Sequence, residues 1–257
     1  MDNLWSSLIV LAAAVWLYMS AWFLLAYQLK RRDAVDSAWG LGFVLVAWLA
    51  ILRNESQNIY VYLAAGLVSV WGLRLFWHLT ARNSKRPEDY RYQAMNLGSW
   101  LRTYVVVFML QGVLLLVISA PVIAIVTTSN EFFRPLAIAG LAIWGFGIAF
   151  EAIADRQLQQ FIANRKTELG QIMTGGLWRY SRHPNYFGEI ISWLGAGIVA
   201  TAAGEWWALI GPAVITILLT KISGIPLLEK RYNKSAQYQQ YKKRTSVLIP
   251  WPPGKNA

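Results

Sequence analysis

The 257-residue sequence contains no cysteine and few charged side chains. The absence of cysteine excludes a disulfide scaffold, a cysteine metal site and a cysteine nucleophile. Charged residues make up only 14% of the chain, whereas a soluble domain carries about 25%. In their place the sequence has 56% hydrophobic residues and 14 tryptophans, which excludes a disordered tail. This composition is typical of a membrane protein.

Long apolar segments recur along the chain. A helix needs about 20 mostly apolar residues to cross a bilayer, and seven windows fit: 4–28, 35–52, 58–80, 99–126, 133–154, 185–203 and 205–222. The first window lacks a basic N-terminal region and is too long for a signal-peptide core, so we expect it to be retained. The sequence predicts an all-α integral membrane protein, with residues 1–257 forming a single domain, a bundle of seven transmembrane helices.

The net charge of +11 is distributed unevenly over these seven spans. Of the 24 basic residues, 22 fall on one side and only Arg53 and Arg134 on the other. The positive-inside rule then places the N-terminus outside and the C-terminus in the cytoplasm. The longest connections lie on the cytoplasmic side, where we expect the functional site: 81–98, 155–184 and 223–257.

Basic residues on several separate segments argue against nucleic acid as a partner. The basic tail 230–244 fits anionic lipid headgroups instead. No protein partner is evident. We expect the protein in the bilayer of a bacterial inner membrane, with its site facing the cytoplasm.

Ionisable residues inside spans are costly and are therefore functional candidates. Asp36 begins the second span, and Arg82 continues a stripe with Arg74 and His78 on the third. Asn185 and Glu189 share a face of the sixth span, as Glu151 and Asp155 do on the fifth. These groups either satisfy one another within the bundle or form a site. Their position near the cytoplasmic boundary favours a site.

The densest polar segment is 174–195. Pro184 suits the first turn of a helix, whose free N–H groups, with Arg179, Arg182 and His183 nearby, predict an anion site. His78 and His183 are the only histidines and lie on different elements, so we expect no metal site.

The segment 174–195 resembles the C-terminal domain of the steroid 5-alpha-reductase family, in a bacterial branch known as a domain of unknown function of the 1295 type. Its match is Asn185-Tyr186-Phe187-Gly188-Glu189-Ile190-Ile191, followed by Trp193 and Gly195. Further matches follow the family's order: Asp36 with Trp39-Gly40, the run 86–92, Asp155 and the tail 244–250.

The resemblance implies a seven-span reductase that binds NADPH on its cytoplasmic side and takes its substrate from the membrane. The matched positions and the flanking cations together give the expected cofactor-binding residues: Arg82, Arg86, Asp155, Arg165, Arg179, Arg182, His183, Asn185, Tyr186 and Glu189.

The family's catalytic tyrosine falls on Trp71, which has no titratable proton. We therefore expect Asp36, held protonated by an apolar site, to be the acid. Tyr92 is the catalytic candidate to replace the missing tyrosine, with Tyr90 as an alternative. Trp39 and Trp71 are expected to bind substrate through an apolar wall.

The run Arg182-His183-Pro184-Asn185-Tyr186-Phe187-Gly188 also resembles isoprenylcysteine carboxyl methyltransferases, as does the tail with Glu229, Tyr238 and Tyr241. Their cofactor, S-adenosylmethionine, favours carboxylate and aromatic neighbours, whereas NADPH needs several fixed cations. The many basic residues in the flanking loops favour an NADPH-dependent reductase that transfers hydride to an activated C=C bond of a steroid- or polyprenoid-like substrate. A methyltransferase and a non-enzymatic lipid-binding protein are the alternatives.

Overall fold

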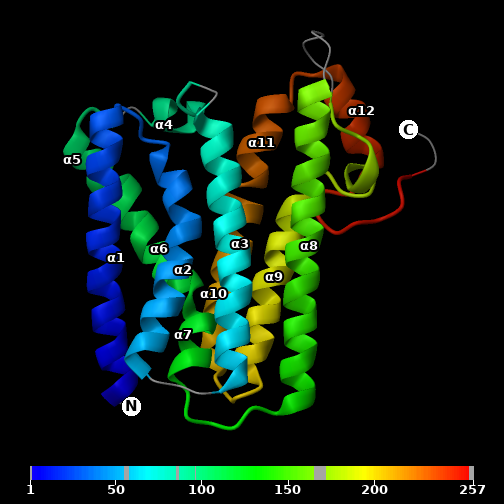
Figure 1. Ribbon diagram of the computed structural model, residues 1–257. Helices are drawn as coiled ribbons and strands as arrows, with labels where there is room; N and C mark the ends of the chain where they lie inside the picture. The colour runs from blue at the N-terminus through cyan, green and yellow to red at the C-terminus, as the bar shows by residue number, and fades with distance from the viewer. Residues whose placement is uncertain (1, 55–57, 85–86, 96, 165–171, 255–257) are drawn as a thin grey trace. The chain divides into compact units, whose positions relative to one another are not determined.

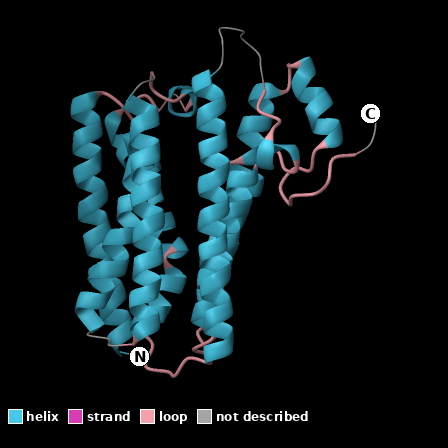
Figure 2. Cartoon of the chain, turned by 45° about the vertical axis from the view of Figure 1, so that its right-hand side comes forward, coloured by secondary structure: helices cyan, strands magenta, loops and turns pink. Residues whose placement is uncertain are grey.

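The computed structural model describes residues 2–54, 58–84, 87–95, 97–164 and 172–254, with side chains from residue 5 onward. In these ranges every regular element is a helix (Figure 2), and the one isolated β-bridge joins Ser181 and Ser246. The chain divides into two compact units, 1–137 with 199–211 and 138–198 with 212–257. Each unit is described by itself.

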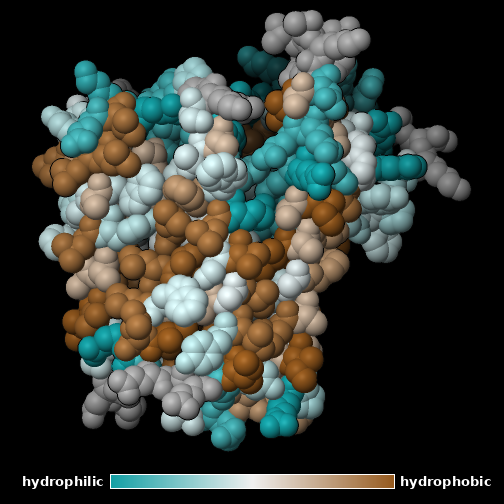
Figure 3. Space-filling view, viewed as in Figure 1, coloured by the Kyte–Doolittle hydropathy of each residue, from teal (hydrophilic) through white to brown (hydrophobic). Residues whose placement is uncertain are grey.

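Unit 1 contains three long helices, α1 (Asp2–Leu29), α2 (Ala34–Asn54) and α3 (Ile59–Ser84), with α2 packed against both others (Figure 1). Its shorter elements are α4 (Tyr90–Ala94), α5 (Trp100–Thr103), the π-helix η1 (Tyr104–Met109), α6 (Leu110–Ile118), α7 (Ala120–Thr127) and the 3₁₀ helix η3 (Trp206–Leu209). Hydrophobic side chains gather over the middle of α2 and α3, and hydrophilic ones toward their ends (Figure 3).

Two glycines let α2 and α3 approach closely. A Cβ atom on Gly40 would lie 2.1 Å from the backbone oxygen of Gly72, and one on Gly72 would lie 2.4 Å from that of Gly40. Only glycine fits such a backbone contact without movement of a helix. The close packing brings the start of α2, with Asp36, beside the end of α3, with Arg82.

Unit 2 contains most of α8 (Arg134–Asn164) and most of α9 (Pro184–Thr201). Its other helices are the 3₁₀ helix η2 (Gly176–Arg179), α10 (Ile210–Ile217), the π-helix η4 (Leu218–Ile222), α11 (Ile225–Tyr232) and α12 (Ala236–Arg244).

Helix α9 packs antiparallel against α8, and three glycines allow the two backbones to approach closely. Cβ atoms on Gly188, Gly147 and Gly195 would lie 2.6, 2.4 and 2.4 Å from the backbone nitrogens of Glu151, Ser192 and Trp144. These contacts extend over two turns of α9, so the two helices stay in backbone contact along most of this length.

Within the described residues, six helices are long and apolar enough to cross a membrane: Trp5–Leu29, Ala34–Asn54, Ile59–Ser84, Trp100–Ile118, Arg134–Asn164 and Trp206–Tyr232. They coincide with six of the seven predicted spans. The remaining span, 185–203, forms α9, whose first turns carry Asn185 and Glu189 and lower its apolarity. The all-helical membrane architecture is thus confirmed, while the count of seven spans and their orientation stay predictions.

The boundaries differ from the sequence prediction in two places. Helix α8 continues to Asn164, ten residues into the predicted loop 155–184, because this stretch contains good helix formers and no glycine or proline. The predicted span 99–126 is interrupted at Ser119, since Pro121 in the next turn has no N–H to donate to a continuous helix.

Candidate functional site

Asp36 and Tyr92 meet in unit 1 in a partly buried group that we call the Asp36 cluster, formed by Asp36, Arg82, Asp89, Arg91 and Tyr92. The phenol of Tyr92, which is 3% exposed, donates a hydrogen bond of 2.5 Å to Oδ1 of Asp36. The guanidinium of Arg91 lies 2.9 Å from Oδ2 of Asp36, and that of Arg82 lies 3.6 Å away.

The N-cap of α4 orients the Tyr92 side chain toward Asp36. The side chain of Asp89 caps α4 by accepting a hydrogen bond of 2.9 Å from the backbone nitrogen of Arg91. The same carboxylate accepts from the Arg91 side chain at 3.1 Å. This cap fixes the first turn of α4, so Tyr92 points inward while Tyr90 remains half exposed.

A second layer of polar groups holds α4 to the start of α2. The backbone nitrogen of Asp89 donates to Asp33 at 3.1 Å, and Arg31 forms an ion pair of 2.8 Å with the same carboxylate. Glu88 accepts from the backbone nitrogen of Arg32 at 2.6 Å. Glu88 and Asp89 belong to the run 86–92 that was noted in the sequence, but their contacts with Arg32 and Asp33 join positions 56 apart and could not be read from it.

The pKa values of the cluster follow its geometry. Burial raises the pKa of Tyr92, and the neighbouring charge of Asp36 raises it further. Burial alone would raise the pKa of Asp89, but its hydrogen bonds to Arg91 prevail and lower it. The phenol therefore keeps its proton at neutral pH, and Asp89 stays ionised. Asp36 lies beside two guanidinium groups and the Tyr92 phenol, and its role as a protonated acid stays a prediction.

Both predicted substrate-binding tryptophans lie near one phenylalanine. The rings of Trp39 and Trp71 contact Phe43 with centroids 5.7 and 5.4 Å apart, and the indole nitrogen of Trp39 donates to Gln111. Trp71 is buried. Trp39 and Phe43 on α2 and Trp71 on α3 thus form one packed aromatic group, and its contact with a substrate stays a prediction.

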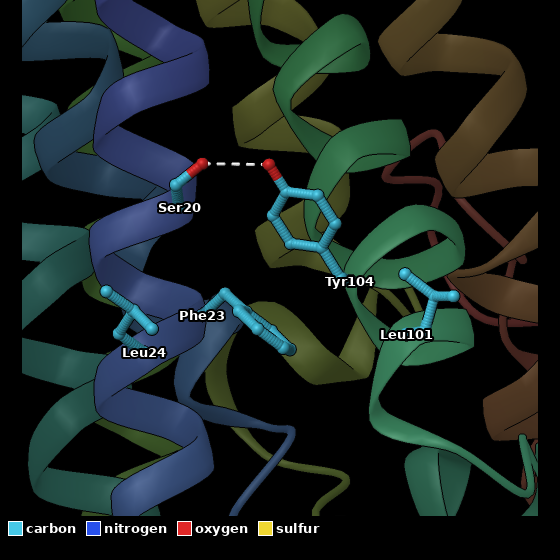
Figure 4. Close-up of a pocket in the computed structure, with 5 residues that line it drawn as sticks. All are labelled: Ser20, Phe23, Leu24, Leu101 and Tyr104. Atoms are coloured by element: carbon cyan, nitrogen blue, oxygen red, sulfur yellow. Dashed lines mark hydrogen bonds between the residues drawn. The ribbon is translucent and has the colours of Figure 1, made fainter.

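An open apolar hollow of about 270 Å³ lies on the surface of unit 1, lined by Ser20, Phe23, Leu24, Leu101 and Tyr104 (Figure 4). Its polar atoms pair with each other, because the hydroxyls of Ser20 and Tyr104 are 2.9 Å apart. Phe23 and Tyr104 also pack against the buried group that contains Tyr92. Two residues that line the hollow thus belong to the packing around this buried group.

In unit 2, Arg182 lies at the centre of a second group, the Arg182 cluster, formed by Arg182, His183, Glu229 and Lys242. Arg182 is only 8% exposed and forms an ion pair of 2.9 Å with Glu229. Lys242 pairs with the other oxygen of Glu229, also at 2.9 Å. The charge of Arg182 is therefore balanced within the protein, and Arg182 is not the free cation that the sequence suggested.

Two buried nitrogen atoms of the Arg182 cluster lack a hydrogen-bond partner, Nε of Arg182 and Nε2 of His183, and Oε1 of Glu229 has the Arg182 guanidinium as its ion-pair partner. The imidazole of His183 stacks on Tyr186, with ring centroids 5.6 Å apart, and Nε2 lies 3.7 Å from Oε1 of Glu229. Burial lowers the pKa of His183 to about 4, so the ring is neutral at physiological pH. Unpaired buried nitrogen atoms of this kind fit a polar ligand.

Aromatic residues of the tail surround the Arg182 cluster. Tyr241 donates hydrogen bonds to the carbonyl oxygens of Trp178 and Ser181. Burial, together with the charge of Glu229, raises the pKa of Tyr238 to about 12. The tail residues Glu229, Tyr238 and Tyr241 were noted in the sequence only for the methyltransferase alternative. Their proximity to Arg182 depends on the tertiary fold.

The remaining predicted cofactor residues are dispersed within unit 2 or lie outside the described residues. Asn185 and Glu189 are partly exposed one turn apart on α9, Asp155 is buried on α8 and Arg179 is exposed in η2. Arg86 and Arg165 lie outside the described residues. Within the described ranges no group of His, Asp and Glu side chains is arranged to hold a metal ion.

Comparisons with known proteins agree with the sequence pattern. The model of a family described as "Protein of unknown function (DUF1295)" matches residues 22–245. The chain is 27% identical to 3-oxo-5-alpha-steroid 4-dehydrogenase 1 of Rattus norvegicus over 46% of its length and 42% of that protein. It is 32% identical to very-long-chain enoyl-CoA reductase of Dictyostelium discoideum over 44% of its length and 35% of that protein.

Methanethiol S-methyltransferase 1 of Bradyrhizobium diazoefficiens is also 32% identical, over 40% of the chain and 34% of that enzyme. The chain thus spans less than half the length of each of these curated relatives. No solved structure matches the chain. The relatives comprise membrane reductases and a methyltransferase, which are the two enzyme classes that the sequence indicated.

Proposed function

Because the chain belongs to the DUF1295 family and is related to the steroid 5-alpha-reductases, we propose that it is a membrane-embedded, NADPH-dependent reductase of an activated C=C bond in a lipid-soluble substrate. The observation that carries the proposal is the hydrogen bond from Tyr92 to Asp36 beside two guanidinium groups. A phenol that is protonated at neutral pH can donate a hydrogen bond to a carbonyl oxygen.

In this mechanism the chain's own residues handle the substrate oxygen. A substrate carbonyl that reached Tyr92 would replace Asp36 as the acceptor of the phenol hydrogen bond. Arg91 and Arg82 would then balance the negative charge that develops on the enolate oxygen. Until the substrate arrives, the Asp36 carboxylate holds the phenol in position by accepting its hydrogen bond.

The route of the substrate is supported by the hollow between α1 and η1. Leu24 and Leu101 are exposed on helices long and apolar enough to cross a membrane, so this hollow is open to lipid. Phe23 and Tyr104 connect it with the aromatic group around Tyr92. A steroid- or polyprenoid-like molecule fits such an apolar surface better than a charged one.

The cofactor would bind at the cytoplasmic face of unit 2. The orphaned donors of Arg182 and His183 fit a polar, anionic group, and exposed Arg179 adds a free cation. NADPH would supply the hydride, while Asn185 and Glu189 would contact its polar groups.

A methyltransferase is the second candidate, and Glu229 is the observation that favours it. A buried carboxylate with Tyr186, Tyr238 and Tyr241 close to the same cluster provides the carboxylate and aromatic neighbours that a sulfonium cofactor requires. Under this reading the Arg182 cluster would bind the amino-acid part of S-adenosylmethionine.

The two candidates are separated by thermal unfolding of the detergent-solubilised protein with either cofactor. We expect NADPH to raise the midpoint and S-adenosylmethionine to leave it unchanged. Stabilisation by S-adenosylmethionine alone would replace the reductase with the methyltransferase. Stabilisation by neither would favour the non-enzymatic lipid-binding alternative.

The proposal includes seven spans, with α9 as the additional crossing. Helix α9 stays in backbone contact with the apolar part of α8 from Gly188 to Gly195, and a helix packed in this way shares the membrane depth of its neighbour. Seven crossings and the positive-inside rule give an outside N-terminus and a cytoplasmic site.

A further inference from the structure

The C-terminal segment after α12 presents three exposed apolar side chains within five residues. Val247, Ile249 and Trp251 are 43, 64 and 69% exposed, whereas Ser246, Leu248 and Pro250 between them are partly covered. The chain bends at residues 247–249, so these three side chains are grouped by their exposure. We call them the C-terminal strip.

Backbone hydrogen bonds fix this segment to the protein. Its carbonyl oxygens accept from the Arg182 backbone nitrogen at 2.8 Å, on Ser246, and from the Ser181 hydroxyl at 2.7 Å, on Leu248. The backbone nitrogen of Trp251 donates to the carbonyl of Tyr180 at 3.0 Å. The strip is thus a preformed apolar surface of unit 2.

The strip lies at the level where α8 changes from apolar to polar. Beyond Ala154, α8 continues with Asp155, Arg156 and Gln157. The indole of Trp178 donates to the carbonyl of Ala154 at 3.0 Å, and Gln157 accepts from the backbone of Leu177 at 2.9 Å. Trp251 is joined to the same loop two residues later, at Tyr180, so it lies close to the edge of the apolar layer.

The neighbouring charges are complementary to an anionic lipid surface. Lys243 and Arg244 are exposed directly before the strip, and Arg179 is exposed beside Tyr180. Tryptophan and tyrosine prefer the headgroup level of a bilayer, and exposed basic residues there bind anionic lipids. We infer that the C-terminal strip docks unit 2 onto the anionic headgroup layer of the cytoplasmic membrane surface.

The cysteine-free sequence allows a direct measurement of depth. Single variants Ile249→Cys on the strip, Gln237→Cys on α12 and Leu17→Cys on α1 would carry a nitroxide label in the full-length protein in vesicles. The accessibility ratio of oxygen to a water-soluble nickel complex measures how deep each label lies. An unchanged unfolding midpoint relative to the parent would establish that each variant is folded.

In vesicles of equal parts phosphatidylcholine and phosphatidylglycerol, we expect the Ile249→Cys label to be several-fold more oxygen-accessible than Gln237→Cys and less so than Leu17→Cys. A value equal to either control would overturn the inference.

A change of lipid tests the role of the charges. The oxygen-to-nickel accessibility ratio of the Ile249→Cys label should fall in vesicles of pure phosphatidylcholine. Lys243→Gln with Arg244→Gln should abolish this lipid dependence, and a dependence that persisted in the double variant would refute the role of the charges. The measurement needs neither cofactor nor activity, so it is independent of the proposed reductase function.

Discussion

At Tyr92, burial and a neighbouring carboxylate act together on one phenol proton. Tyr92→Phe removes the hydrogen-bond donor and keeps the ring, so we expect the rate of NADPH-dependent enone reduction to fall about 10²- to 10⁴-fold. A panel of lipid-soluble enones with NADPH oxidation as the signal measures this effect. Tyr90→Phe, two residues away and half exposed, is the matched control and should retain the parent rate. An equal loss in both variants would argue against the donor role.

At His183, the lowered pKa makes the stability depend on pH. The unfolded chain binds a proton near pH 6.5, whereas the folded protein resists protonation until about pH 4. Stability is therefore full above pH 6.5 and is lost as the pH falls toward 4, by at most about 3 kcal/mol. The difference in unfolding free energy between the parent and His183→Gln, followed from pH 7 to 4, isolates this contribution from that of the carboxylates. If the difference in unfolding free energy between the parent and His183→Gln did not change with pH, the lowered pKa of His183 would be contradicted.

At the scale of elements, the contact of α8 with α9 depends on glycine. A Cβ on Gly188 would lie 2.6 Å from the backbone nitrogen of Glu151, so Gly188→Ala should force the helices apart and destabilise the protein by about 1–3 kcal/mol. Gly145→Ala is the matched control on α8, because no atom lies within 4 Å of its added Cβ. We expect this variant to be as stable as the parent or slightly more stable, since alanine favours helix. Thermal unfolding in detergent gives both values.

For the whole molecule, the crossing of α9 decides which connections share a side of the membrane. If α9 crosses, Arg179 and Lys234 lie on the cytoplasmic side and Asn130 lies outside. Single cysteines at these positions in the cysteine-free chain can be labelled with an impermeant thiol reagent in intact cells. We expect labelling only at Asn130. Labelling at Lys234 but not at Arg179 would mean that α9 does not cross.

Local features of the sequence were sufficient for much of this architecture. The apolar windows predicted all the long helices, because the cost of exposing backbone polar groups to lipid makes helix the default in such segments. The segment 182–189 identified the family, since its residues are contiguous. The ends of α8 and the interruption at Ser119 were less predictable, because polar helix formers extend one helix while Pro121 interrupts another.

The apolar segments of the sequence by themselves determined an all-helical chain with helices long and apolar enough to cross a membrane. Only the tertiary structure decided which residues pair. Tyr92, and not Tyr90, reaches Asp36 because the Asp89 cap orients α4. Arg182 pairs with Glu229, 47 positions away, so that its Nε is the buried guanidinium nitrogen left without a hydrogen-bond partner. Such pairings follow from the packing of helices distant in the chain, and no local pattern of residues encodes that packing.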